Sequence, residues 1–247
     1  MNLNEKLQFD DDTGEANSKY FRSMVGDLIY LTHTRPDIAF SVGVISRFMH
    51  SPSKHHLGAA KRVLRYIAGT NDFGLWYDHD SDFKLLGFTD SDWAGCLEDR
   101  KSTSGYVFSL GSAVISWCSK KQATTALSSS EAEYVAATST ACQAVWLQRI
   151  LEDLRHKQIE ATKIYCDNKS AIAMSKNPSY HGKTKHIDLR IHFIRELVAK
   201  EFITLEFCNT NEQVADIFTK SLPCKKHMYF RNQLGVCRFE SRRSVEN

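Results

Sequence analysis

The spacing of apolar residues changes once along this chain, near Phe73, and that change limits the folds it can adopt. From residue 19 to residue 69, apolar residues recur at helical spacing, as they do between Phe21 and Leu28. After Phe73, short runs rich in β-branched and aromatic residues alternate with helical patterns. The chain is therefore predicted to form a short helical segment followed by an α/β domain.

Terminal signals divide the first segment into three short helices. Pro36 and Pro52 suit first helical turns, and Ser51 is the expected N-cap. Gly69 suits a helix end. Beyond it we expect strands at 73–77, 84–89, 105–110, 113–118, 163–166 and 202–207, of which those at 105–110 and 113–118 form a hairpin. Helices are expected from about 128 to 154, at 170–175, at 187–200 and from about 213.

The composition excludes several classes of protein. With 247 residues the chain can bury a sizeable core, and its net charge of +3 indicates no particular partner. Its seven cysteines include no C-x-x-C pair, which favours free thiols in a reducing compartment over disulfides or a zinc site. We find no signal peptide and no apolar run long enough to span a bilayer. We therefore expect an intracellular, cytoplasmic protein that is not bound to membranes.

Two glutamates in the stretch SSSEAEYVAA, Glu131 and Glu133, lie at the start of the predicted long helix. At roughly 100° per residue their side chains point about 200° apart, so they cannot serve one site. Glu131 follows Ser128 by three residues, which is the spacing of a capping box. Glu133 lies beside small apolar residues, with no helical Lys or Arg four positions away. Glu131 is thus given a structural role, whereas Glu133 is either exposed or awaits a partner from elsewhere.

Three aspartates lie at the ends of predicted elements. Asp90 ends the first strand of the sheet in LLGFTDSDWAG, and Asp167 ends the fourth in KIYCDNKSA. Asp216, in NEQVADIFTK, is expected in the first turn of the last helix, where negative charge offsets the helix dipole. Each alone is explained as a turn or cap residue. If the first and fourth strands are neighbours, all three meet Glu133 in a cluster that repels itself without cations.

Divalent cations would remove that repulsion. Mg²⁺ prefers oxygen ligands and keeps several waters. Two such ions about 3.5 to 4 Å apart can activate a water, stabilise pentavalent phosphorus and hold a leaving 3′ oxygen. The four carboxylates together therefore indicate phosphodiester hydrolysis with two Mg²⁺ ions as cofactors, for which Mn²⁺ can substitute.

Several long motifs follow one another along the second part of the chain: GFTDSDWAGC, RKSTSGYVFSLGSAVISWCSKKQ, SSSEAEYVA, YCDNKSAI, KTKHIDLRIHFIRE and ADIFTKSLP. Together they resemble the ribonuclease H region of copia-type long-terminal-repeat retrotransposon Pol polyproteins. Upstream, YFRSMVGDLIYLTHTRPDIAFSVGVISRFM and HHLGAAKRVLRYIAGT are similar to the end of the reverse transcriptase of the same polyproteins. The resemblance runs from about Lys19 to Gly235.

This resemblance implies an α/β, RNase H-like fold, which is a five-stranded mixed sheet flanked by helices, preceded by a small helical segment. The implied divisions are a disordered acidic start at 1–18, a remnant of the reverse transcriptase thumb or connection at 19–70, an RNase H-like domain at 71–235 and a tail at 236–247. The implied catalytic and metal-binding residues are Asp90, Glu133, Asp167 and Asp216. The implied activity is ribonuclease H, with RNA:DNA hybrid as substrate and the upstream reverse transcriptase domains of the polyprotein as partners.

The sequence departs from the family pattern in two places. The polymerase motif, a Tyr followed by paired aspartates on a hairpin, is absent, and FDDDT at Phe9 lacks the strand context to replace it, so we expect no DNA synthesis. Cellular ribonucleases H carry a histidine before the last aspartate that helps turnover, whereas LEFCNTNEQVAD contains none. Asp92 is a competing acid, because it shares a strand face with Asp90 and an outer role at the metal site stays open for it.

Basic residues near these acids are expected to contact nucleic acid: Lys120, Lys121, Lys183, Lys185 and Arg190. Lys and Arg outnumber Asp and Glu between residues 176 and 200, although a solvated helix face explains that balance equally well. His181, His186 and His192 lie there with poor spacing for a metal site. Trp93 and Trp117 are expected in the core rather than as base-stacking platforms.

Three functions remain open. The first is a nuclease that cleaves the RNA of an RNA:DNA hybrid, in which 2′-hydroxyls and groove shape identify the RNA strand. The second is an integrase-type polynucleotidyl transferase, which is disfavoured because integrases place their glutamate after two strand aspartates and Glu133 comes second in chain order. The third is a catalytically idle remnant that folds and at most binds nucleic acid.

Overall fold

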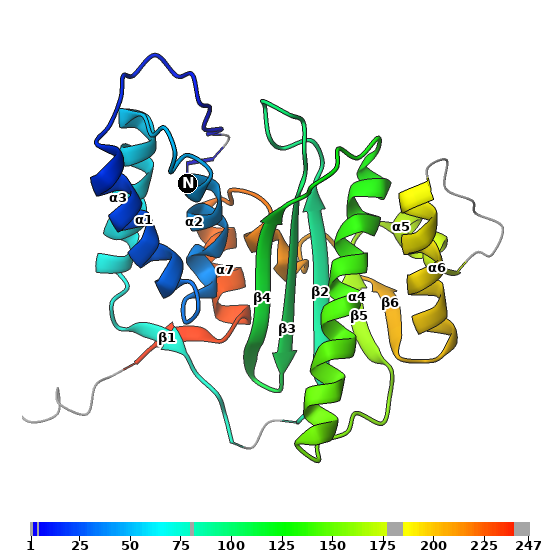
Figure 1. Cartoon of the computed structure of the whole chain (residues 1–247). Coiled ribbons are helices and arrows are strands. Elements are labelled where there is room, and N and C mark those ends of the chain that lie inside the picture. Colours follow the sequence, from blue (N-terminus) through cyan, green and yellow to red (C-terminus); the bar gives the residue numbers. More distant parts are fainter. Residues whose placement is uncertain (1, 4, 80–81, 177–184, 240–247) are drawn as a thin grey trace, which may run out of the picture. The chain divides into compact units, whose positions relative to one another are not determined.

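The computed structural model describes residues 2–3, 5–79, 82–176 and 185–239, which form two compact units. The first unit comprises Met1–Tyr77 together with Lys220–Asn247, and the second comprises Asp78–Thr219. Figure 1 labels the helices and strands of both. These boundaries differ from those expected at 71 and 235, because the last helix and strand of the chain pack with the first helices.

The first unit contains the three predicted helices and the C-terminal elements. Its elements are α1 (Ser18–Leu31), the 3₁₀ helix η1 (Pro36–Ile38), α2 (Ala39–Ser46), α3 (Lys54–Ala68), β1 (Phe73–Leu75), α7 (Cys224–Gln233) and β7 (Val236–Arg238). Ser53 rather than Ser51 caps α3, because its side chain accepts a hydrogen bond from the backbone of His56 while the His56 ring accepts one from the backbone of Ser53. β1 pairs antiparallel with β7 and not with the larger sheet.

The N-terminal segment differs from the disorder expected for residues 1–18. Leu7 is buried in the core of the first unit. Glu5 binds Arg62 at 2.7 Å and His55 at 2.9 Å, and both of these residues lie on α3. Local composition does not reveal this packing, because the residues that hold the segment lie far along the chain.

The second unit is built on a five-stranded mixed sheet with the strand order β4-β3-β2-β5-β6. Its elements are β2 (Leu85–Asp92), β3 (Thr103–Leu110), β4 (Ala113–Lys121), α4 (Ser129–Asp153), β5 (Thr162–Cys166), α5 (Lys169–Lys176), α6 (Lys185–Ala199), β6 (Ile203–Phe207) and the 3₁₀ helix η2 (Val214–Phe218). β2, β3 and β4 pair antiparallel, whereas β5 runs parallel to both β2 and β6. The predicted five strands and the adjacency of the first and fourth are confirmed.

Helices α4, α5 and α6 pack on one face of this sheet, with α4 in front in Figure 1. Small residues on α4, including the fully buried Ala137, Ala141 and Ala144, allow the helix to lie close to the strands. Thr89 on β2 points to this face, where its hydroxyl accepts a hydrogen bond of 2.9 Å from Thr140. Asp90, the next residue on β2, points to the opposite face because side chains alternate along a strand. That opposite face is crossed by η2.

The helix predicted from about residue 213 begins at Val214 with Asp216 in its first turn, but it is a short 3₁₀ helix and not the last helix of the chain. The chain leaves η2 after Phe218 and begins α7 only at Cys224. Pro223 precedes α7 as its N-cap, and proline has no N–H to donate within a continuous helix. Asp216 therefore lies on a short 3₁₀ helix in the second unit, and α7 belongs to the first.

Candidate metal centre

The end of β2 and the end of β5 bring two aspartates to the same edge of the sheet. β2 and β5 are parallel neighbours, with Phe88 opposite Tyr165. Asp90 lies near the end of β2 and is buried, and Asp167 directly follows β5 and is half-buried. Parallel strands present their carboxyl ends at one edge, so the two side chains lie close together.

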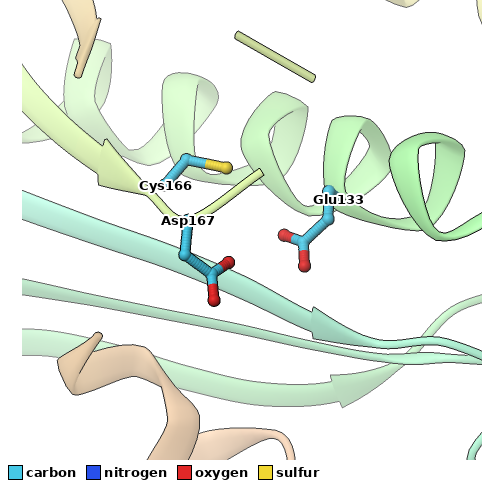
Figure 2. Close-up of side chains that lie close together, drawn as sticks. All are labelled: Glu133, Cys166 and Asp167. Carbon is cyan, nitrogen blue, oxygen red and sulfur yellow. The ribbon is translucent and has the colours of Figure 1, made fainter. Parts of the chain in front are cut away.

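Four carboxylates gather at this edge in two overlapping groups. One ligand atom from each of Asp90, Asp167 and Asp216 lies within 4.8 Å of the others. A second group, at the same spacing, joins Asp167 to Glu133 and Cys166. Figure 2 shows the carboxylates of Glu133, from α4, and Asp167 pointing toward one another. Asp167 belongs to both groups and is therefore the centre of the cluster.

Threonine hydroxyls orient two of these carboxylates. Thr219 Oγ1 donates a short hydrogen bond to Asp90 Oδ2. Thr210 Oγ1 donates to Asp167 Oδ2 at 2.9 Å. Neither threonine was predicted as a site residue, because each lies far along the chain from its aspartate and no local pattern links the two.

Two cysteines near the cluster have raised thiol pKa values. Burial raises the pKa of the Cys208 thiol to about 12, and the charges of Asp167, Asp216 and Asp90 add to that rise. Burial and then the charge of Glu133 raise the pKa of the Cys166 thiol. Burial and these nearby charges therefore disfavour the thiolate form of both cysteines in the metal-free protein.

These donors fit a hard divalent cation. Mg²⁺ is bound by oxygen, commonly with few protein carboxylates and several waters. The Asp90, Asp167 and Asp216 oxygens are close enough together to surround one such ion, and Glu133 extends the set on the side of α4. The sulfur of Cys166 is a poor ligand for this ion, because hard cations such as Mg²⁺ prefer oxygen.

The two glutamates of α4 have different surroundings. Ser128 Oγ accepts a hydrogen bond from Glu131 N, and the Glu131 carboxylate accepts one from Leu127 N at 2.9 Å, one residue before the expected partner. Glu133 is buried and lies at the carboxylate cluster. The predicted capping role of Glu131 is therefore confirmed, with a shifted partner.

Asp92 is tied to the connection between β2 and β3. Its Oδ1 accepts a short hydrogen bond from the backbone N–H of Thr103. Gly95 is needed beside it, since a Cβ at that position would lie 1.6 Å from Asp92 Oδ2. These contacts hold Asp92, the last residue of β2, beside the first residue of β3 and the start of the loop between the two strands.

The predicted nucleic-acid contacts fall in several environments. Lys120 is exposed on β4, whereas Lys121 forms an ion pair of 2.9 Å with Asp99. Arg190 is half-buried on α6. Lys183 and the side chain of Lys185 lie outside the described residues.

One of the environments predicted for the histidines and tryptophans is wrong. His181 and the side chain of His186 lie outside the described residues, and His192 is exposed on α6. Trp117 is half-buried. The expectation that Trp93 lies in the core is wrong, because 54% of it is exposed while its indole N–H donates to Ala126 O at 3.3 Å.

The strand order, the mixed pairing and the helices on one face define the second unit as an RNase H-like α/β fold. The structure of the foamy viral protease-reverse transcriptase in complex with RNA/DNA hybrid shares this architecture at a TM-score of 0.50 and 13% identity, covering 81% of this chain and 26% of that one. No family model matches the chain.

Two curated relatives are similar to most of the chain. The chain is 44% identical to the retrovirus-related Pol polyprotein from transposon TNT 1-94 of Nicotiana tabacum, over 92% of this chain and 17% of that protein. It is 39% identical to the corresponding polyprotein from transposon RE1 of Arabidopsis thaliana, over 94% of this chain and 16% of that protein. The chain is therefore similar over most of its length to copia-type retrotransposon Pol polyproteins, and it spans only about one sixth of their length. In the part of the chain that the structure describes, no helix has the length and hydropathy needed to cross a bilayer.

Proposed function

We propose that this chain is a ribonuclease H that cleaves the RNA strand of RNA:DNA hybrids. The observation that carries the proposal is the convergence of Asp90, Asp167 and Asp216 at the edge of an RNase H-like sheet, with Glu133 beside Asp167. Similarity to retrotransposon Pol polyproteins over more than nine tenths of the chain supports it. The glutamate comes second in chain order, which favours this reaction over that of an integrase.

The four carboxylates are proposed to hold two Mg²⁺ ions, for which Mn²⁺ can substitute. When bound, such ions supply an activated water and stabilise the charge that develops on the phosphate and the leaving 3′ oxygen. The chain's own contribution is to fix the ligands: buried Asp90 and Asp216 are held in the fold, and Asp167 is oriented by Thr210. The expected products carry 5′-phosphate and 3′-hydroxyl ends.

Hybrid recognition is proposed to depend on shape and on the 2′-hydroxyls of the RNA strand. Lys120 supports this as an exposed cation on the second unit. Lys121 is assigned a weaker contact, because its ammonium already pairs with Asp99. Lys183, Lys185 and Arg190 remain proposed phosphate contacts on the basis of sequence.

The chain's place in a longer polyprotein bears on its partners. Because it spans 16–17% of its curated relatives, we propose that reverse transcriptase domains of the same polyprotein act with it. We also propose that helices α1 to α3 derive from the end of that reverse transcriptase. This assignment rests on the motifs between residues 20 and 70.

The experiment that tests the proposal compares substrates and metals. Purified chain is incubated with labelled RNA:DNA hybrid and with matching double-stranded RNA, in Mg²⁺ and in EDTA, alongside the Asp167→Asn variant. We expect cleavage of the RNA of the hybrid alone, lost in EDTA and in the variant. Binding of hybrid without cleavage, even with Mn²⁺, would instead identify an idle remnant.

A further inference from the structure

The short helix η2, which carries Asp216, crosses three neighbouring strands at one level of the sheet. In the strand register Asp90 lies opposite Gly105, and Gly105 lies opposite Ser119. Residues directly opposite one another on paired strands project from the same face. The three positions therefore form a row, and η2 lies over that row.

Each position of the row makes a different contact with the end of η2. At one end Thr219 Oγ1 donates to Asp90 Oδ2, and at the other Ser119 Oγ donates to Phe218 O at 2.6 Å. Between them, a Cβ at Gly105 would lie 2.7 Å from Thr219 Cγ2 and 2.8 Å from Phe218 Cβ. A glycine at 105 is therefore what lets η2 lie directly on the sheet.

The start of η2 is attached to the same strand. Gln213 is fully buried, and its Nε2 donates to Thr89 O at 2.9 Å. Its Oε1 accepts from Ala215 N at 3.2 Å. This single amide thus joins the residue before Asp90 to the residue before Asp216, so η2 is held to β2 at both of its ends.

The proton of the Thr219 hydroxyl has two acceptors within reach. Thr219 Oγ1 lies 3.3 Å from Asp216 O, and it also makes the shorter contact with Asp90 Oδ2. A hydroxyl donates one hydrogen bond, and of these two contacts the one with Asp90 Oδ2 is the shorter. Thr219 therefore donates its hydrogen bond to Asp90. Because Thr219 is fully buried, no water molecule competes for this hydrogen bond.

We propose that Thr219 is a positioning residue for the metal centre, whose hydroxyl fixes the Asp90 carboxylate and ties it to the helix that carries Asp216. This inference rests on the proposed function for its metal, Mg²⁺, and adds a residue outside the four acids. Removal of a residue that hydrogen-bonds to a metal ligand typically lowers metal affinity or activity by about 10- to 100-fold. Thr219 is expected to act in this range.

The test is a calorimetric Mg²⁺ titration of the whole chain without nucleic acid. Thr219→Val removes the hydroxyl and keeps the shape of the side chain, so we expect Mg²⁺ affinity to fall about tenfold or more. Thr219→Ser restores the donor, and its affinity should stay within about threefold of the wild type. Mg²⁺ binding by Thr219→Val that equals the wild type, or absence of Mg²⁺ binding by the wild type, would overturn the inference.

A matched control is available at the other end of the sheet. Thr162 is also buried, and its hydroxyl accepts from Gln148 Nε2 at 2.8 Å at the start of β5. Gln148 keeps a second acceptor, Phe202 O at 2.8 Å, so Thr162→Val removes a buried hydroxyl without disturbing the cluster. Its Mg²⁺ affinity should match the wild type, and an equal loss in both valine variants would overturn a specific role for Thr219.

Two further measurements keep the inference separate from folding and from the proposed function. If Thr219→Val does not fold, Ser119→Ala decides, because it loosens η2 without touching a carboxylate. An affinity loss of about tenfold supports the inference, and an affinity within about threefold of the wild type overturns it. In hybrid cleavage, Thr219→Val should raise the Mg²⁺ concentration for half-maximal rate and leave the KM for hybrid unchanged. A wild type that binds Mg²⁺ but does not cleave would contradict the proposed function alone.

Discussion

Buried carboxylates occur in both units of this chain, but their neighbours differ. In the first unit Asp37 accepts two hydrogen bonds from the Arg35 guanidinium, at 2.9 and 2.8 Å, and one of 2.7 Å from Tyr66. In the second unit, Asp90 and Asp216 lie beside a further carboxylate, and a threonine hydroxyl contacts Asp90. The first arrangement is balanced by a cation of the chain itself. The second gathers like charges, which is the arrangement expected where a cation comes from solution.

Breaking the balanced arrangement should have the largest effect. Arg35→Met leaves Asp37 buried without its cation, so we expect the free energy of unfolding to fall by about 3–5 kcal/mol. Urea denaturation measures this loss. The double replacement Arg35→Met with Asp37→Leu should recover most of it, because a buried pair can be exchanged for apolar residues at little cost. A single variant as stable as the wild type would show that the ion pair contributes little.

The like-charged arrangement should respond in the opposite way. Asp167→Asn removes one of the clustered charges, so in EDTA we expect a higher melting temperature than that of the wild type. Mg²⁺ at about 100 times its Kd should add about 2.7 kcal/mol of stability to the wild type and none to the variant. Thermal unfolding with and without Mg²⁺ checks both statements. A variant that melts lower in EDTA would mean that Asp167 stabilises the fold without metal.

A smaller effect that depends on pH is expected at Asp11. Burial acts to raise its pKa, but hydrogen bonds from Ser53 and Thr13 outweigh burial and lower the pKa from 3.8 to about 2. A carboxyl with a lowered folded pKa contributes stability above its unfolded pKa and loses it as the pH falls through the folded pKa. The N-terminal segment should therefore detach between pH 3.8 and about 2.

Pepsin cleavage across that range measures the detachment. Release of the N-terminal segment should increase as the pH falls in the wild type. In Asp11→Asn, release should depend less steeply on pH, because Glu5, which pairs with His55 and Arg62, still titrates with a lowered pKa. A pH dependence as steep as that of the wild type would assign the transition to another carboxyl.

The smallest effect should come from an exposed ion pair. Glu196 lies on α6 and Lys200 directly follows this helix. The distance from Lys200 Nζ to Glu196 Oε1 is 2.6 Å, but about 60% of each side chain is exposed. Exposed pairs gain little over water. Glu196→Gln should therefore unfold in urea at the wild-type midpoint, in contrast to Arg35→Met. A large shift would mean that distance, rather than burial, decides the strength of ion pairs here.

Much of the fold and the proximity of the acids were predictable from local patterns. The strands around Asp90 and Asp167 have clear boundaries, and parallel pairing brings their ends together. The capping role of Glu131 followed from its spacing to Ser128. The proximity of the four carboxylates is thus confirmed, while their catalytic role stays a prediction.

What escaped prediction depends on contacts between distant parts of the chain. The hydrogen bond from Thr219 to Asp90 joins residues 129 positions apart, and no local spacing indicates it. The packing of α7 with the first helices includes a contact from His227 to Asp37 O at 3.2 Å, which is equally non-local. Trp93 was misplaced because a large aromatic residue after a strand is usually buried, whereas here it lies in a loop.

The measurement that tests the central claim most directly compares two neighbouring glutamates. Glu133→Gln and Glu131→Gln make the same chemical change two residues apart, one at the carboxylate cluster and one at the helix cap. We expect Glu133→Gln to abolish Mg²⁺-dependent cleavage of the RNA in a hybrid and Glu131→Gln to retain it at nearly the wild-type rate. Equal activity in the two variants would contradict the assignment of the cluster as the catalytic metal centre.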